Sequence, residues 1–233
     1  HAFAVSAYQS AWLKTHYPLE FYISLINNQP MGFYPLETLK QDARKFGIDF
    51  CNPNINLSHG KCTINGNALL IGFEFIKGVG VHNSKNILDE RNARGPFDSV
   101  GDFVRRVQIK PDVIEAIIFS GAFDLIEPNR KLALWKSGFY KGPSEYQITL
   151  PISMDESTPD LMDFSEYEKM ILEYDSMGMY PKGHIMEFIR PSLPKNVLST
   201  YEVYSVEEGE TVSVCGIGIA RQHPRGHKGT VFV

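Results

Sequence analysis

The sequence predicts a multidomain protein that is mainly α-helical with small β elements, an α+β chain. Three observations support this prediction. Apolar residues recur at helical spacing through most of the 233 residues, glycine-centred turns divide helical segments in the middle of the chain, and short alternating runs favour strands at two places. The chain is 43% hydrophobic and 21% charged, so it can bury one large core or two to three small ones.

The first fifty residues predict three helices. AFAVSAYQSAWLKTHYPLEFYISLINNQ, residues 2–29, places apolar residues at helical spacing and is interrupted at Pro18, which indicates two helices joined at a proline as a helical hairpin. A third helix is predicted over residues 35–46, because proline is favoured in the first turn of a helix and Gly47 ends the pattern.

A β-hairpin follows these helices. KCTINGNALLIGF, residues 61–73, carries Asn65-Gly66 between two short apolar runs. Asn-Gly is the dipeptide favoured in a two-residue hairpin turn, because both positions adopt positive φ. The hairpin leads the chain directly into the stretch FIKGVGVHNSKNI.

A helix, a glycine turn and a second helix then occur twice within about fifty residues. The first copy has Gly78 and Gly80, followed by helical periodicity over residues 81–92. The second has a helix that Pro111 opens and Gly121 ends, and it restarts after AFD. Two such units packed face to face would share one small core, made of Phe73, Ile76, Val79, Ile87, Leu88, Ile114, Ile117 and Phe123.

Further helices surround these units. Between the two copies, GPFDSV predicts a turn in which Asp98 or Ser99 caps the helix VGDFVRRV. Residues 140–160 are rich in Pro, Ser and acidic residues and are interpreted as a linker. FSEYEKMILEYDSMG predicts an amphipathic helix over residues 164–177 that Gly178 ends.

The chain finishes with strand patterns. TVSVCGIGIA, residues 211–220, alternates as a strand, RQHPRGHKG is a basic turn, and TVFV begins a second strand. The N-terminal HAFAVSAYQS has neither a starting Met nor the pattern of a signal peptide, so we expect a piece of a longer chain. No window approaches 18 uninterrupted apolar residues, and no membrane contact is expected.

The KGVG stretch raises a question of chemistry. Gly78 and Gly80 permit positive φ and leave amide N–H groups uncovered by a Cβ, so the turn could present its main chain to a phosphate; a tight turn between helices would need the same glycines for steric reasons. The spacing is that of the helix-hairpin-helix motif, whose amides and second-helix N-terminus point at a DNA phosphate. The second copy favours the phosphate interpretation. The predicted DNA-binding residues are Lys77, Gly78, Val79, Gly80 and Lys85, with Arg105 and Arg106 beside the second hairpin.

Charge is unevenly distributed along the chain. Residues 77–110 hold seven basic and four acidic side chains, residues 141–190 hold four basic and ten acidic ones, and residues 211–233 hold three basic ones and no carboxylate. The acidic segment would repel a phosphate backbone, so we expect it to face protein. The acidic residues expected to be exposed on helix 164–177 are Glu166, Glu173 and Asp175.

Cysteine and histidine usage predicts no metal site. Cys51, Cys62 and Cys215 are scattered without CxxC spacing, which favours a reducing, cytoplasmic compartment. His223 and His227 have a zinc-ligand spacing, but with Cys215 they lack a fourth ligand. The group of Cys51, His59 and Cys62 also lacks a fourth ligand.

Five segments in order resemble one known family. HAFAVSAYQSAWLKTHYPLEFYISLINNQPMGFYP, LKQDARKFGIDFCNPNIN, GFEFIKGVG, GPFDSVGDFVRR and IEAIIFSGAFDLI are similar, over almost the whole chain, to the C-terminal part of the alpha subunit of bacterial DNA polymerase III, a C-family DNA polymerase. NQPMGFYP, NRKLALW and EYDSMGMYPKGHIMEFIRP are more similar to the error-prone paralogue than to the replicative subunit.

The resemblance implies a domain map. Residues 1–58 would be the C-terminal end of the polymerase fingers, 59–130 a tandem helix-hairpin-helix domain, 131–199 a linker and helical connecting region, and 200–233 the truncated beginning of an OB-fold. In the family, carboxylates of an upstream palm hold the Mg²⁺ ions of a nucleotidyltransferase reaction. No residue of this chain is therefore assigned a catalytic or metal-binding role, and the fragment alone is predicted to be inactive.

The resemblance also implies a function and partners. The chain would grip duplex primer-template DNA non-specifically through phosphates, as part of a DNA-directed DNA polymerase in replication, repair and error-prone translesion synthesis. A free-standing helix-hairpin-helix scaffold and a DNA-repair binding module are the alternatives. Single-stranded DNA would bind the completed OB-fold. A sliding clamp or accessory proteins are further implied partners, but TPDLMDF lacks the Gln of the family's clamp motif, so direct clamp binding is expected to be weak.

Overall fold

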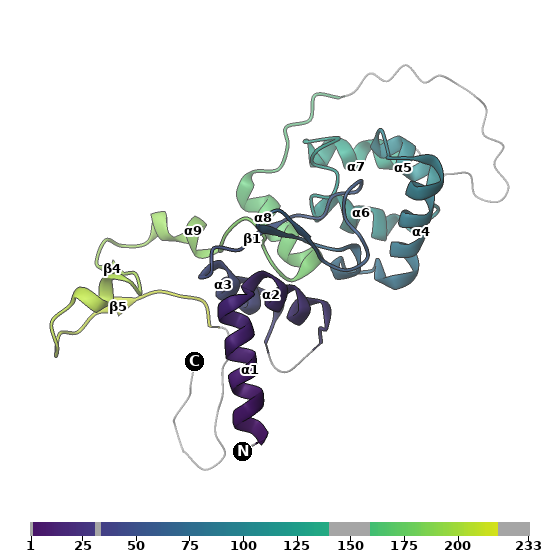
Figure 1. Cartoon of the computed structure of the whole chain (residues 1–233). Coiled ribbons are helices and arrows are strands. Elements are labelled where there is room, and N and C mark those ends of the chain that lie inside the picture. The colour runs from purple at the N-terminus through teal and green to yellow at the C-terminus, as the bar shows by residue number, and fades with distance from the viewer. Residues whose placement is uncertain (1, 31–33, 140–158, 219–233) are drawn as a thin grey trace, which may run out of the picture. The chain divides into compact units, whose positions relative to one another are not determined.

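The computed structural model describes residues 2–30, 34–139 and 159–218 (Figure 1). The chain divides into two compact units, His1–Lys182 and Gly183–Val233. In chain order the helices and strands are α1 Ala2–His16, α2 Pro18–Asn27, α3 Leu36–Arg44, β1 Asp49–Cys51, β2 Thr63–Asn65, β3 Ala68–Leu70, α4 Gly80–Arg94, α5 Val100–Arg106, α6 Pro111–Phe119, α7 Arg130–Phe139, α8 Glu166–Met177, α9 Met186–Ile189, β4 Val197–Leu198 and β5 Ser213–Val214. The 3₁₀ turns are Phe73–Phe75, Arg190–Ser192 and Glu202–Ser205. The prediction of a mainly helical chain with small sheets is confirmed.

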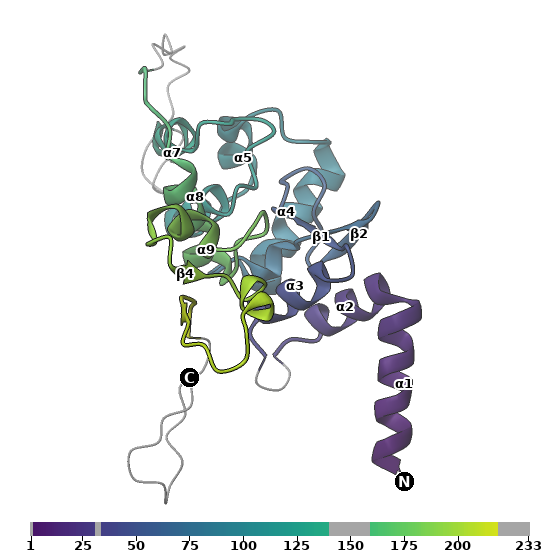
Figure 2. The same ribbon diagram turned by 90° about the vertical axis from the view of Figure 1, so that its left-hand side faces the viewer.

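The first two helices meet at Pro18, as predicted, but they do not form a hairpin. Backbone hydrogen bonds from Tyr17 to Leu13 (2.8 Å) and from Phe21 to Tyr17 (2.9 Å) bridge the junction. Because a single residue separates the helices, no loop is long enough to reverse the chain. α1 instead extends away from α2 (Figure 2), and its Phe3 side chain is 92% exposed.

A three-stranded sheet contains the predicted hairpin and one further strand. β2 and β3 pair antiparallel, with Thr63 opposite Leu70 and Asn65 opposite Ala68. The two turn residues are therefore Gly66 and Asn67 instead of the expected Asn65 and Gly66, and only Gly66 has a positive φ, of +64°. β1 pairs with β3 in parallel, with Phe50 opposite Leu69, and the sequence pattern did not predict this pairing. β3 is therefore the central strand, and the chain that leaves β1 at Cys51 lies beside it.

The predicted core exists, and it is part of a larger one. All eight residues named above belong to or pack against one buried cluster, which also takes in Tyr22 and Ile26 of α2. Its aromatic rings meet edge to face: Phe97 and Phe103 have centroids 5.1 Å apart, and Phe103 and Phe123 are 5.2 Å apart. α2 and the two glycine-turn units thus share one hydrophobic core.

The two helix–glycine–helix units differ from the predicted pattern. The segment before KGVG is only a 3₁₀ turn, Phe73–Phe75, because the chain has just left β3. In the second unit α6 ends at Phe119, but the next helix begins at Arg130 rather than directly after AFD. Ser99 is the cap of α5, since its hydroxyl accepts the amide of Asp102 at 3.1 Å.

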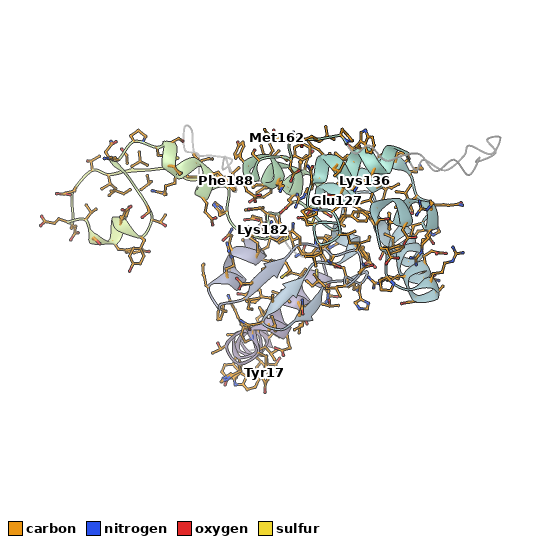
Figure 3. The ribbon with its side chains drawn as sticks, turned by 90° about the horizontal axis from the view of Figure 1, so that it is seen from above. Tyr17, Glu127, Lys136, Met162, Lys182 and Phe188 are labelled. Atoms are coloured by element: carbon orange, nitrogen blue, oxygen red, sulfur yellow. The ribbon has the colours of Figure 1, made fainter. Side chains whose placement is uncertain are left out.

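α7 and α8 are the last two helices of the first unit. α8 begins behind a capping box of Ser165 and Glu168 and ends at Gly178, whose φ of +73° confirms the predicted left-handed cap. In α7, the ammonium of Lys136 pairs with Glu127 at 2.6 Å (Figure 3).

In the described part of the second unit, residues 183–218, the helices and strands are short. β4 and β5 pair in parallel, with Val197 opposite Ser213, so part of the predicted strand 211–220 is present. The predicted basic turn and second strand, residues 221–233, and all but the end of the predicted linker 140–160 lie outside the described residues. Within the described ranges, no helix has the length and apolar character needed to span a bilayer.

Candidate nucleic-acid interface

The KGVG turn adopts the backbone that the glycines predicted. Gly78 has φ +81° and Gly80 has φ +58°, both in the left-handed region that glycine favours. A Cβ on Gly80 would meet no atom within 4 Å, and one on Gly78 would meet only Cγ2 of Val113 at 3.6 Å. The turn therefore needs these glycines for their φ angles and is open on its outer side, where a phosphate could approach.

The amides of this turn divide into an inner and an outer set. The amide of Lys77 donates to the carbonyl of Ser176 in α8 at 2.8 Å, and that of Val79 donates to Ile76 at 3.1 Å. The amides of Gly78 and Gly80 have no acceptor among the described residues. Because α4 starts here with no side-chain cap, its first-turn amides add to this outer set. The partial positive charge of a 15-residue helix thus faces solvent at this point.

The two predicted lysines flank the KGVG turn in the chain: Lys77 directly precedes Gly78, and Lys85 lies in the second turn of α4. Lys77 and Lys85 are exposed, and neither forms an ion pair with a described residue. Val79, the valine between the glycines, is 2% exposed and packs into the core. Val79 thus fixes the turn to the core, and the lysine side chains remain available to an anion.

The two arginines of α5 lie in different environments. Arg105 is exposed. The guanidinium of Arg106 donates to the carbonyl oxygens of Glu90, Gly95 and Pro96 at 2.8–3.1 Å and to the carboxylate of Asp102 at 2.9 Å. Its side chain is only 10% exposed. Arg106 therefore joins the end of α4 to α5 through its N–H donors. A phosphate contact would need these same donors.

The second glycine turn is closed by the protein itself. Gly121 has φ +83°, but a Cβ there would lie 2.5 Å from Nη2 of Arg130 and 2.5 Å from Nδ2 of Asn52. These two nitrogens donate to Oε1 of Glu173 in α8, at 2.6 and 2.8 Å. Arg130 also pairs with Asp124 at 2.7 Å. The two turns are therefore unlike: the first is open and the second is filled.

The pKa values of both buried partners at the second turn are raised. Burial lowers the pKa of Arg130, but the hydrogen bonds and charges of Asp124 and Glu173 outweigh burial, so its pKa is raised and it stays a cation. Burial raises the pKa of Glu173, and the neighbouring Arg130 offsets only part of this effect, so the pKa stays above its ordinary value. Removing one partner would leave a buried charge uncompensated.

One sequence-based expectation for α8 was wrong. Glu166 and Asp175 are exposed, as expected, but Glu173 is fully buried because that face of the helix covers the Gly121 turn. Sequence reasoning also missed Asn52, Arg130 and Ser176. Neither a motif nor a periodicity marks them, since their roles arise from contacts between segments far apart in the chain.

The described residues contain no group of three or more His, Cys, Asp or Glu side chains arranged to hold a metal ion. Burial raises the pKa of the Cys62 thiol to about 12, so this thiol is protonated at neutral pH. His223 and His227 lie outside the described residues.

Comparisons with known proteins place a known motif in this part of the chain. A family model described as a helix-hairpin-helix motif matches residues 47–133. Three similar proteins are named error-prone DNA polymerase: one from Symbiobacterium thermophilum (30% identical), one from Corynebacterium diphtheriae (31%) and one from Mycobacterium tuberculosis (31%). Each match covers 100% of this chain and 26%, 22% and 21% of the respective relative. The chain thus spans about a fifth to a quarter of the length of these curated relatives.

Proposed function

The chain is a relative, along its whole length, of bacterial proteins named error-prone DNA polymerase, and from this premise we propose that it is the duplex-gripping part of such an enzyme. It holds product DNA by its backbone phosphates, without reading base sequence. The observation that carries the proposal is the open KGVG turn, where two glycines of positive φ leave amides unpaired at the start of a 15-residue helix.

The residues of the turn have separate roles in this proposal. The amides of Gly78 and Gly80 donate to phosphate oxygens, and Lys77 and Lys85 add charge. Val79 anchors the turn through its buried side chain. On α5, Arg105 contacts a neighbouring phosphate, while Arg106 positions the helix from within the fold.

The whole protein would be a DNA-directed DNA polymerase, a nucleotidyltransferase of the cytoplasm that acts in replication, repair and error-prone translesion synthesis. Its catalytic palm, with the carboxylates that hold Mg²⁺, would lie outside this chain, and we assign none of these residues to that metal. Residues 1–58 would end the fingers, 59–130 form the DNA-binding domain, 131–199 connect it, and 200–233 begin an OB-fold. The names of the relatives favour this function over a free-standing scaffold or a separate repair module.

Further partners would bind elsewhere on the protein. The basic residues of segment 211–233 support single-stranded DNA as the partner of a completed OB-fold. Direct binding of a sliding clamp at TPDLMDF is weak in this proposal, because the fold already uses this segment. The carbonyl of Leu161 accepts Nδ2 of Asn129 at 2.5 Å, and Phe164 packs against Phe119 and Lys131. An accessory protein would then provide recruitment.

Titration of a labelled duplex at several salt concentrations tests the proposed grip. The log–log dependence of affinity on salt should have a slope of about −0.9 per neutralised phosphate. The double variant Lys77→Ala, Lys85→Ala should bind all duplex sequences more weakly and lower the slope by about two. Lys45→Ala combined with Lys195→Ala removes the same charge from exposed positions elsewhere and serves as the control. Unchanged affinity and slope in the first double variant would refute the proposal.

A further inference from the structure

The structure links the open turn to the filled one through α8. We infer that Glu173 is a positioning residue of the phosphate site: it anchors α8 at the Gly121 turn, and α8 then fixes the KGVG turn in its binding conformation. This inference rests on the proposed function and adds that only one of the two glycine turns takes a phosphate. At the second turn, the carboxylate of Glu173 takes the place that a phosphate would have.

The anchor is a buried hydrogen-bonded group. Oε1 of Glu173 accepts from Nη2 of Arg130 at 2.6 Å and from Nδ2 of Asn52 at 2.8 Å. Arg130 is 1% exposed, begins α7 and also donates to the carbonyl of Phe119 at 3.1 Å. Asn52 directly follows β1. A single carboxylate, buried from water, thereby fastens α8 to the start of α7 and to the segment after β1, and through Arg130 to the end of α6.

One turn of α8 separates Glu173 from Ser176, the residue that contacts the KGVG turn. Ser176 lies three residues after Glu173, and its carbonyl is one of the last four of α8, which have no partner within the helix. This carbonyl accepts the amide of Lys77 at 2.8 Å. Met177 and Met179 are buried on either side of the helix end, so the end of α8 cannot shift without disturbing the core.

The hydrogen bond to Ser176 decides which amides face outward. With the amide of Lys77 held by α8 and that of Val79 held by Ile76, the amides of Gly78 and Gly80 are left for an anion. If α8 moved, the Lys77 amide would lose its acceptor and the peptide before Gly78 could rotate. The outer amides would then change their orientation, and phosphate affinity would fall although every basic side chain remained.

Hydrogen exchange in the absence of DNA tests the anchor by itself. In the full chain, Glu173→Gln keeps the shape of the side chain but removes the charge that Arg130 requires. The amide of Lys77 should then exchange at least 10-fold faster, while the amide of Phe103 in α5 keeps its protection. Asp175→Asn is the matched control, because it removes the same charge from an exposed position of the same helix. Unchanged protection of Lys77 in Glu173→Gln would overturn the inference.

Duplex titration supplies the second readout, because the direction of the change in affinity separates two explanations. Loss of a negative charge alone would strengthen DNA binding, as expected for Asp175→Asn. Glu173→Gln should instead weaken binding about 3- to 10-fold with an unchanged salt slope, because the lysines remain. Binding equal to or tighter than that of the unchanged protein would refute the coupling. If Glu173→Gln does not fold, Asn52→Ala, which removes one hydrogen bond and no charge, should show the same changes at smaller size, and their absence would refute the inference.

Failure of the inference and failure of the proposed function give different results. If the lysine double variant leaves DNA binding unchanged, the phosphate site itself is wrong, whatever the exchange data show. If that variant weakens binding while Glu173→Gln changes neither exchange nor affinity, the site stands and the role of Glu173 is wrong.

Discussion

The guanidinium of Arg106 lies over the ring of Phe97, 4.4 Å from its centroid, and closes the turn between α4 and α5. Phe97 is buried, and its backbone amide is held by the side chain of Asn56 at 2.8 Å. The arginine stacks on this ring while it donates to the carbonyl oxygens of Gly95 and Pro96 in the turn and of Glu90 in α4. The pair therefore joins the helix that carries Lys85 to the helix that carries Arg105.

Arg106→Ala should destabilise the fold, by about 2 kcal/mol or more, because it removes a stacked cation and leaves several carbonyl oxygens without their charged donor. Arg105→Ala removes the same charge from an exposed position and should change the free energy of unfolding by less than about 0.5 kcal/mol. Urea unfolding measures both effects. Equal losses of stability in the two variants would contradict the role given to Arg106.

The two glycine turns should respond differently to alanine. Gly80→Ala should cost about 1–2 kcal/mol, because only its φ of +58° opposes a side chain and the space beside it is open. Gly121→Ala combines a φ of +83° with contacts of 2.5 Å to Arg130 and Asn52, so its cost should be about 2–5 kcal/mol. Thermal unfolding with calorimetry gives the comparison. A Gly121→Ala protein as stable as Gly80→Ala would show that the second turn is not filled.

Asp42 should contribute a pH-dependent share of stability. The hydrogen bonds from Lys14 (2.5 Å) and Tyr22 (2.6 Å) lower the pKa of Asp42 to about 2, below the value of about 3.9 expected in the unfolded chain. Its contribution is therefore present above about pH 4 and is lost as the pH falls towards 2. Since the pair is about one-third exposed, we expect less than about 1 kcal/mol.

Unfolding of Asp42→Asn and the unchanged protein, measured from pH 2 to 7, checks this prediction. The difference in unfolding free energy should be constant above about pH 4.5 and should shrink below it. Asp175→Asn, a change at an exposed carboxylate, provides the baseline. A difference that grows towards low pH would have the wrong sign.

The chain by itself should not extend a primer. With Mg²⁺, a primed template and all four nucleotides, we expect no incorporation, because the proposed catalytic palm lies outside this sequence. A gel-based extension assay measures it, with an intact polymerase as positive control. Template-directed extension by a clean preparation of this chain would overturn the proposed domain map.

Sequence patterns predicted the local features of this protein. Most of the longer helices, a hairpin at Asn65-Gly66 and the glycine ends of α3 and α8 at Gly47 and Gly178 were predictable, because periodicity and turn chemistry act over a few neighbouring residues. The KGVG turn belongs to this class, since positive φ at two glycines is a local property. Resemblance to known segments added the polymerase family, which the relatives support.

Tertiary structure alone decided which of these features are open to a ligand. The two glycine turns look alike in the sequence, but distant residues fill only the second one. There Glu173 meets Asn52, 121 positions earlier in the chain, and Arg130, 43 positions earlier. The same packing buried Glu173, which helical periodicity had placed on the surface. It also paired β1 with β3 in parallel. Such contacts depend on how whole elements pack to exclude water from a shared core, and no short stretch of sequence contains that information.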